Sequence, residues 1–309
     1  MSRIRISGSA CRKCMAQSLP VDMMIRFAQI ASPQYDIYKN SGIPEGIPIS
    51  NQNAATMIVT DLIEENRIID FVEALIEIDL HGYMGRRYEL RGLNDVVTSI
   101  VDAGYVYDSA TGQFFENQSE RISQNWGRLR EDDEKIMAVL RLDIVGNSSL
   151  VKQNPSTSIK KAYDALREIV TKAVVSRLGR LWSWEGDGAL GVFLFGHKEK
   201  AAVYAAMEIL HELFFYNKLE NPLNKDINVR IAVHLGPIRY SNNSMERLKN
   251  ETIKEAVRHE SESIPSNTVG VSWNVYLSVD KSIQDLLYLP GKRASENAVR
   301  LYQVGVDKS

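Results

Sequence analysis

The sequence predicts an α+β protein in two parts, a mostly helical N-terminal part and a C-terminal part built around a β-sheet. Apolar residues recur at helical spacing in the first part, for example at Met57, Ile58 and Leu62. After residue 136, short apolar runs alternate with helical patterns in a β-α-β-β-α-β order, which is typical of a ferredoxin-like sheet. A chain of 309 residues has room for both parts as separate domains.

The composition argues against two classes of partner. A formal net charge of −2 favours neither nucleic acid nor a membrane surface. An apolar stretch at 201–215 is interrupted by Glu208, His211 and Glu212, so we expect no membrane span. Because no apolar segment with a cleavage site follows the N-terminal arginines, we expect a cytoplasmic protein.

Residues 1–20 are polar and are expected to form a flexible tail. This tail contains the two cysteines of the chain, Cys11 and Cys14, at Cys-x-x-Cys spacing. The spacing is that of half a zinc site or of a redox pair, but no further cysteine completes a zinc site and no strand–helix pattern flanks the motif. Incidental thiols are therefore favoured.

Residues 21–117 are expected to form a helical regulatory or interaction domain. Helical patterns begin at Ala54, Ile68 and Leu93, and two aromatic-rich runs around Gly112 indicate a hairpin. Three helices and a hairpin are also the outline of a winged helix, for which DNA binding would be the function. The third helix, however, has hardly any lysine or arginine that could meet phosphates, so an interaction module is favoured.

Residues 118–136 are expected to form a linker helix, because Ile122, Trp126 and Leu129 recur at helical spacing. Residues 137–309 make up the second domain. Its predicted elements are a strand at 137–144, a helix from about 158, a hairpin at 181–195, a helix at 198–216, a strand at 227–234, a charged stretch at 245–262, a strand near 268, a helix at 274–286 and a strand at 299–304.

Two aspartates in this domain indicate chemistry. Asp143 ends an apolar strand, and Asp187 lies at the tip of the hairpin. A carboxylate at the end of a buried strand is costly unless it is paired, and two carboxylates on neighbouring strand ends suit a divalent cation. For either residue alone, an ordinary turn aspartate is the alternative interpretation.

Four blocks of sequence resemble, in order, the catalytic domain of class III nucleotide cyclases over roughly residues 135 to 306. They are Leu-Asp-Ile-Val-Gly around Asp143, Glu-Gly-Asp-Gly around Asp187, the block Arg-Ile-Ala-Val-His-Leu-Gly at 230–236, and Gly-Val-Ser-Trp-Asn ending at Asn274. The resemblance implies a ferredoxin-like class III cyclase domain. It also implies the conversion of a nucleoside triphosphate to a 3′,5′-cyclic nucleotide and diphosphate.

The resemblance further implies which groups hold the cofactors and how the chains assemble. Two divalent cations, Mn²⁺ or Mg²⁺, would be bound by Asp143, Asp187 and the carbonyl of Ile144. The family works as a homodimer with active sites at the subunit interface. In each site, one subunit supplies the metal aspartates, and the other supplies the residue corresponding to Asn274, which orients the ribose.

One position departs from the family pattern. Where the family has an arginine that stabilises the pentavalent phosphate, this chain has Ser278. Losing one preorganised cation costs a few kcal/mol of barrier. Lys281 or Arg293 is the candidate substitute, and the sequence leaves the choice open.

The base-reading positions match neither purine pattern of the family. They hold Ser183 and Asn267, and the tryptophan-flanked hairpin is similar instead to the bacterial pyrimidine cyclases of the Pycsar anti-phage systems. The resemblance implies production of cyclic UMP from UTP or cyclic CMP from CTP. Candidate contacts to the base are Tyr163, Arg180 and Trp184.

Three further interpretations stay open at this point. Alternation along a regular strand would put the side chains of Trp182 and Trp184 on one face, where they form either core or a wall of the base pocket. An adenylate cyclase is an alternative activity. A catalytically degenerate domain that binds a nucleotide and regulates through the N-terminal part is another, and Ser278 is its best support.

Overall fold

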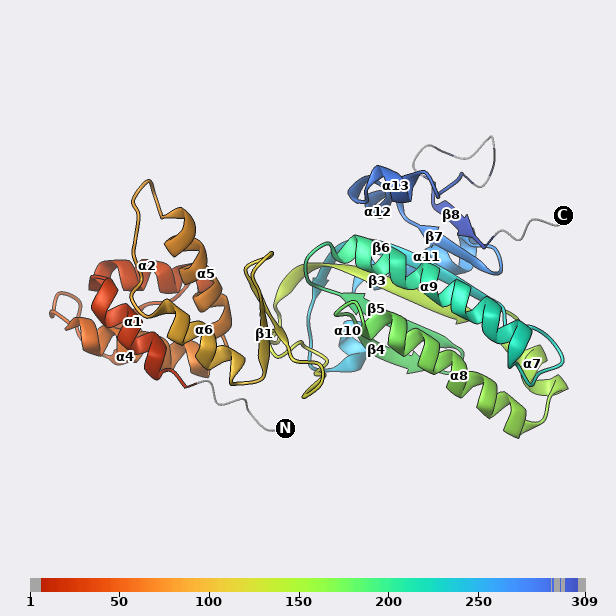
Figure 1. Ribbon diagram of the computed structural model, residues 1–309, viewed down its shortest axis with the longest axis horizontal. Coiled ribbons are helices and arrows are strands. Elements are labelled where there is room, and N and C mark those ends of the chain that lie inside the picture. Colours follow the sequence, from red (N-terminus) through yellow and green to blue (C-terminus); the bar gives the residue numbers. More distant parts are fainter. Residues whose placement is uncertain (1–6, 290, 292–294, 296–297, 305–309) are drawn as a thin grey trace. The chain divides into compact units, whose positions relative to one another are not determined.

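The computed structural model describes residues 7–289, 291, 295 and 298–304. The chain forms two compact units, an N-terminal unit of Met1–Leu129 and a C-terminal unit of Arg130–Ser309 (Figure 1). In the described parts of the chain, every helix is too short or too polar to cross a bilayer.

The N-terminal unit consists of helices followed by one hairpin, counted over the described residues. Its core gathers Phe27, Ile58 and Phe71 from three different helices, all with no exposed surface. The predicted helices from Ala54, Ile68 and Leu93 and the hairpin around Gly112 are all present. The elements are α1 (Ser9–Ser18), α2 (Val21–Ala31), α3 (Ile37–Ser41), α4 (Asn51–Glu64), α5 (Ile68–His81), α6 (Leu93–Val101), β1 (Tyr105–Asp108) and β2 (Gln113–Glu116).

The predicted flexible tail is wrong over most of its length, because Ser9–Ser18 form helix α1. Cys11, Cys14 and Met15 lie on one face of this helix and are buried in the core of the unit. Burial raises the pKa of the Cys14 thiol to about 11 and also raises the pKa of Cys11. Both thiols are free and stay protonated at neutral pH, so they pack like small apolar side chains.

The predicted linker helix is also wrong. Residues 117–133 are all described and contain no helix, and the next element begins at Glu134. Trp126 and Gly127 have φ angles of 53° and 69°, which end any right-handed helix there. The apolar spacing instead reflects packing, because Trp126 and Leu129 are buried.

The C-terminal unit has a sheet in the strand order β4-β5-β3-β6-β7-β8, counted over the described residues. The first four of these strands pair antiparallel, which with their chain order is the arrangement expected of a ferredoxin-like sheet. β7 then adds parallel to β6, and β8 adds antiparallel to β7. The strands are β3 (Glu134–Ile144), β4 (Arg180–Glu185), β5 (Gly188–Phe193), β6 (Val229–Arg239), β7 (Thr268–Val271) and β8 (Arg300–Gln303).

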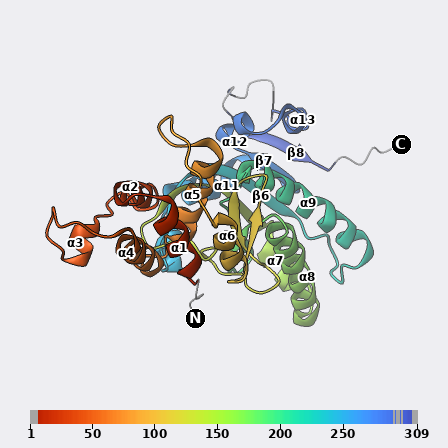
Figure 2. The same cartoon turned by 60° about the vertical axis from the view of Figure 1, so that its left-hand side comes forward.

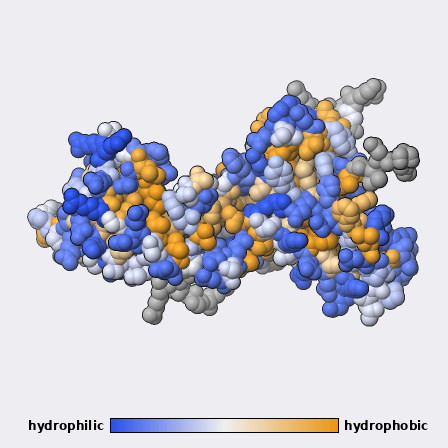
Figure 3. Space-filling view, in the orientation of Figure 1, coloured by the Kyte–Doolittle hydropathy of each residue, from blue (hydrophilic) through white to orange (hydrophobic). Residues whose placement is uncertain are grey.

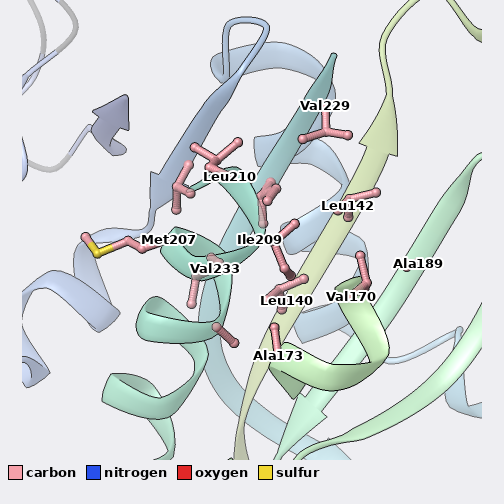
Figure 4. Packing of buried hydrophobic residues seen from close by; sticks show 14 of the residues in the cluster. Leu140, Leu142, Val170, Ala173, Ala189, Met207, Ile209, Leu210, Val229 and Val233 are labelled. Atoms are coloured by element: carbon pink, nitrogen blue, oxygen red, sulfur yellow. The ribbon is translucent and has the colours of Figure 1, made fainter. Parts of the chain in front are cut away.

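Two long helices, α8 (Ser156–Val175) and α9 (Lys198–Leu219), lie side by side on one face of this sheet (Figures 1 and 2). Alternate residues of β3 face them, so Leu140 and Leu142 pack against Val170 of α8 and Ile209 of α9 (Figure 4). This cluster is the main core of the unit. It fixes the strand ends that follow Leu142.

The opposite face of the sheet is covered by α11 (Glu251–Ser263), which the sequence showed only as a charged stretch. Alternate residues of β6 meet this helix: Arg230 pairs with Glu260, the His234 ring lies 5.5 Å from the His259 ring, and Gly236 adjoins Thr252. The remaining helices of the unit are α7 (Asn147–Gln153), α10 (Ser244–Arg247), α12 (Trp273–Ser278) and α13 (Lys281–Gln284).

Candidate active site at the strand ends

The register of the sheet brings the predicted metal ligands to one end of it. Asp143, next to last in β3, lies opposite Gly188 at the start of β5, and Asp187 directly precedes Gly188 in the hairpin turn. The backbone N–H of Ile144 donates to the carbonyl oxygen of Asp187 at 3.2 Å. Asp143, Ile144 and Asp187 are therefore neighbours on adjacent chain segments.

Asp143 is held by a charge pair across the sheet. Nη2 of Arg230 donates a 2.8 Å hydrogen bond to Oδ2 of Asp143, its register partner on β6. On its other side, Nε of Arg230 lies 2.7 Å from Oε1 of Glu260. Burial raises the pKa of Glu260, and Arg230 counteracts this shift. One guanidinium thus connects Asp143 to a buried carboxylate of α11.

Asp187 is held from the α8 side by a chain of neutral groups. Nδ2 of Asn147 donates a 2.8 Å hydrogen bond to Oδ2 of Asp187, and the hydroxyl of Tyr163 donates to Oδ1 of Asn147. Burial, followed by the charge of Asp187, raises the pKa of Tyr163. Tyr163 therefore stays a hydroxyl donor at neutral pH.

A second arginine lies beside the hairpin. A Cβ added to Gly188 would sit 2.4 Å from Nη2 of Arg141, so glycine is needed there for the guanidinium to pass. Arg141 precedes Asp143 by two residues and shares its face of β3. Two guanidinium groups, those of Arg141 and Arg230, thus lie near the hairpin turn and Asp143.

The donor set fits a hard cation that keeps open coordination positions. Two carboxylates and a backbone carbonyl offer only oxygen, which Mg²⁺ and Mn²⁺ prefer. Among the described residues, no cluster of three or more His, Cys, Asp or Glu side chains could enclose a metal ion. Such cations commonly complete their shell with water and substrate phosphates, so Asp143, Asp187 and Ile144 would be enough protein ligands for one.

Within one chain, Asn274 lies away from Asp143, past the far end of the short strand β7. Arg230 pairs with both Asp143 and Thr268, the first residue of β7, whereas Asn274 lies in α12, beyond the last residue of β7. At about 3.3 Å per residue along a strand, this separation exceeds 10 Å. Asn274 is exposed, and its carbonyl accepts a 2.7 Å hydrogen bond from the hydroxyl of Ser278.

Lys281 and Arg293 are the two candidate substitutes for the missing arginine, and the structure describes Lys281. Lys281 begins α13, is exposed, and pairs with Asp285 at 2.8 Å. This partner raises the pKa of Lys281. Arg293 lies outside the described residues.

Arg180 and Ser183 lie at different distances from the hairpin turn. Arg180 is opposite Val192, at the end of the hairpin away from Asp187, and its buried guanidinium donates to the Gly179 carbonyl at 3.0 Å. The structure does not bring it to the aspartates. Ser183 is partly buried opposite Leu190, nearer the turn.

The two tryptophans do not share a face, because a β-bulge falls between Leu181 and Ser183. Trp184 packs against the main core with the guanidinium carbon of Arg167 5.3 Å from its ring centre. Trp182 is buried instead beside Tyr240, with ring centres 5.9 Å apart. The extra residue cancels the alternation on which the sequence prediction rested.

Asn267 has a backbone role in the turn before β7. It has a φ angle of 54°, its Oδ1 accepts from the backbone N–H of Val229 at 3.2 Å, and its Nδ2 donates to Asn228 at 2.7 Å. Both ends of the amide are therefore engaged in joining β6 to β7.

Sequence reasoning missed Asn147, Arg141 and Glu260. Glu260 had a signal, because it falls at helical spacing with Ile253 and Ala256 on the apolar side of α11. Asn147 and Arg141 had none, since their roles depend on which strand lies opposite.

No protein-family model and no curated protein matches this chain. Solved structures similar to it include the guanylyl cyclase Cya2, with 16% identity, a TM-score of 0.48, and coverage of 58% of this chain and 98% of that one. Another is the adenylyl cyclase CyaB from P. aeruginosa, with 17% identity, a TM-score of 0.46, and coverage of 58% and 98%. A third is an adenylate/guanylate cyclase/hydrolase from Silicibacter pomeroyi, with 21% identity, a TM-score of 0.45, and coverage of 57% and 100%.

Proposed function

We propose that the C-terminal unit is a metal-dependent nucleotide cyclase, which converts a nucleoside triphosphate to a 3′,5′-cyclic nucleotide and diphosphate. The observation that carries the proposal is the placement of Asp143 opposite Gly188, which puts Asp143 and Asp187 at the same end of the sheet. The block order of the sequence resemblance supports the same reaction.

Divalent cations bound at this site would neutralise the triphosphate and lower the pKa of the 3′-hydroxyl. The chain's own residues have positioning roles. Asp143, Asp187 and the Ile144 carbonyl would hold the cations, Arg230 would orient Asp143, and the Arg141 guanidinium beside Gly188 would offer a positive charge to the phosphates. The 3′-oxygen then attacks the α-phosphorus, its proton leaves to solvent, and the bond to the diphosphate breaks.

The proposed site needs a second copy of the chain. Asn274 lies too far from Asp143 in one chain to contact the same ribose, so it would act in the site of a partner subunit. The surroundings of Asn274 suit an interface. Leu277, Leu286 and Tyr288 are 59%, 54% and 43% exposed, and Figure 3 shows apolar surface among polar residues near α12 and α13.

We propose further that the base is a pyrimidine and that the substrate is UTP or CTP. Asn267, at one purine-reading position of the family, is engaged at both ends of its amide by the β6–β7 turn. Ser183, at the other, is neither the lysine nor the glutamate of the two purine patterns. Trp184 and the ring of Tyr163 remain the proposed pocket contacts, while the Tyr163 hydroxyl is engaged with Asn147. The resemblance of the hairpin to pyrimidine cyclases would place the product in anti-phage signalling.

A second candidate function is nucleotide binding without turnover. The observation that favours it is Ser278, whose hydroxyl donates to the Asn274 carbonyl where the family has a catalytic arginine. Lys281 and Arg293 are the proposed replacements that would keep the site active.

The test is product formation by the full chain from ATP, GTP, CTP and UTP, each with Mn²⁺ and with Mg²⁺, resolved by mass. We expect cyclic UMP or cyclic CMP, lost in Asp143→Asn and Asp187→Asn. The matched control is Asp226→Asn, which removes the carboxylate of a surface pair with Lys218. Cyclic AMP alone would contradict the pyrimidine proposal. A folded chain that binds nucleotide but makes no cyclic product would contradict the cyclase proposal and favour the binding function.

A further inference from the structure

Helix α11 carries one carboxylate on its buried face. Thr252, Ile253, Ala256 and Glu260 are its buried residues, and the side chain of Glu260 is 5% exposed. Burying a carboxylate costs several kcal/mol unless a cation is placed against it. Its cation is Arg230, whose Nε lies 2.7 Å from Oε1 of Glu260.

Arg230 has a second partner. While Nε faces Glu260, Nη2 donates at 2.8 Å to Oδ2 of Asp143, one of the two carboxylates proposed to bind the cations. A guanidinium on this carboxylate competes with a divalent cation for the same oxygen. How strongly Arg230 competes with the cation depends on how much of the guanidinium charge is neutralised by Glu260.

We propose that Glu260 is a positioning residue for the metal site, acting through Arg230. By neutralising Arg230 and holding its guanidinium by Nε, Glu260 leaves Asp143 available to a divalent cation while keeping it oriented. This inference rests on the proposed cyclase function. It adds a group that lies outside the four blocks resembling the cyclase family, in a helix between the third and fourth blocks.

The direction of the effect follows from the charges. Glu260→Gln removes one negative charge from the pair at nearly constant volume, so the whole positive charge of Arg230 falls on Asp143. The site becomes more positive and Asp143 less available, and both changes weaken cation binding. Groups that orient metal ligands are commonly worth 10- to 100-fold in metal affinity.

The experiment measures Mn²⁺ binding directly, by the loss of the free Mn²⁺ electron paramagnetic resonance signal on titration with the full chain. No nucleotide is added, so the readout does not depend on turnover. We expect Glu260→Gln to weaken Mn²⁺ binding by about tenfold. The matched control is Glu262→Gln, which makes the same charge change at an exposed position of the same helix and should bind as the parent does.

A double-mutant cycle with Arg230→Gln isolates the route of the effect. In that background Glu260→Gln should change the Mn²⁺ affinity by less than about twofold, because the group through which it acts is gone. Glu260→Asp keeps the charge one methylene further from Arg230 and should fall between the parent and the glutamine variant. This variant provides the same comparison if Glu260→Gln does not fold.

The outcomes are distinct. Equal Mn²⁺ affinity in the parent and in Glu260→Gln would overturn the inference and leave the proposed function standing. An equal loss in both Arg230 backgrounds would also overturn it, because Glu260 would then act without Arg230. A folded parent that binds no Mn²⁺ would contradict the metal site itself, and with it both proposals.

Discussion

Nδ2 of Asn147 donates a 2.8 Å hydrogen bond to Oδ2 of Asp187. Asn147 is the first residue of α7, and it follows Gly146, which turns the chain with a φ angle of 69°. The bond engages one carboxylate oxygen of Asp187, in the turn that lies beside Asp143. The loop after β3 thus orients a residue of the following hairpin.

Asn147→Leu removes this donor while keeping most of the side-chain volume. Without it the Asp187 carboxylate rotates more freely, and we expect kcat/KM to fall by about tenfold with either metal ion. The measurement is steady-state product formation. Lys152→Met, at an exposed position of the same helix, is the control and should match the parent. An unchanged kcat/KM in Asn147→Leu would mean that Asp187 is held without this bond.

Tyr163→Phe separates two roles of one hydroxyl. The hydroxyl donates to Asn147, so its removal should lower the rate of product formation from every nucleoside triphosphate by the same factor. That factor is a few-fold if the hydrogen bond contributes about 1 kcal/mol. A direct contact to the base would instead change the preference among substrates. Relative rates with an equimolar mixture of UTP and CTP distinguish the two, and a shifted product ratio would count against the orienting role.

The sheet and its connections could be predicted from the sequence because apolar periodicity carries that information. The strand that carries Asp143 near its end and the hairpin with Asp187 in its turn occur where a run of apolar residues gives way to polar ones. What could not be predicted depends on partners remote in sequence. The contact between Glu260 and Arg230 exists only because α11 covers the face of the sheet opposite α8 and α9.

Three errors have local causes that the apolar pattern did not reveal. Trp126 recurs at helical spacing but lies in a turn, because burial alone produces the same apolar spacing. Trp182 leaves the alternation of β4 because a bulge inserts one residue, and bulges have no simple apolar signature. The polar α1 was mistaken for a tail because two cysteines and a methionine supply its buried face.

His234 makes the stability of the protein pH-dependent. Burial, as the main cause, and His259, as the second, lower the pKa of His234 from an ordinary value of 6.5 to about 4. Glu255 and Arg258 are its other charged neighbours. The folded state therefore holds a neutral imidazole. Below pH 6.5 the unfolded chain binds the proton more readily, so stability is full above 6.5 and falls toward about 4.

The expected result is a urea unfolding midpoint that decreases between pH 6.5 and 4 in the parent. His234→Gln cannot take up the proton and should show a smaller decrease over that range, whatever its stability at neutral pH. Identical pH dependence in the two proteins would show that other groups control acid unfolding.

Arg128 stabilises the N-terminal unit. Its Nη1 and Nη2 each lie 2.7 Å from the Glu73 carboxylate, and Nη2 also contacts Asp70. Arg128→Met leaves the carboxylate of Glu73 without this cation in a mostly buried place. We expect the free energy of unfolding to fall by about 3 kcal/mol. Arg26→Met, at an exposed position of α2, is the control in denaturant titrations, and equal effects of the two changes would contradict this role.

The central claim is that one active site takes Asp143 and Asp187 from one chain and Asn274 from another. Mixing two inactive variants, Asp143→Ala and Asn274→Ala, tests it most directly. In a mixed dimer one site carries both changes and the other carries neither. Because half of randomly exchanged dimers are mixed, activity should return to about a quarter of the parent value.

The measurement is the rate of cyclic nucleotide formation after the two variants are mixed in equal amounts and allowed to exchange. Each variant alone should be inactive, and the mixture should recover toward that quarter with time. A mixture that remains inactive although the subunits exchange would contradict the account, because Asn274 would then not complete a site formed by the aspartates of another chain.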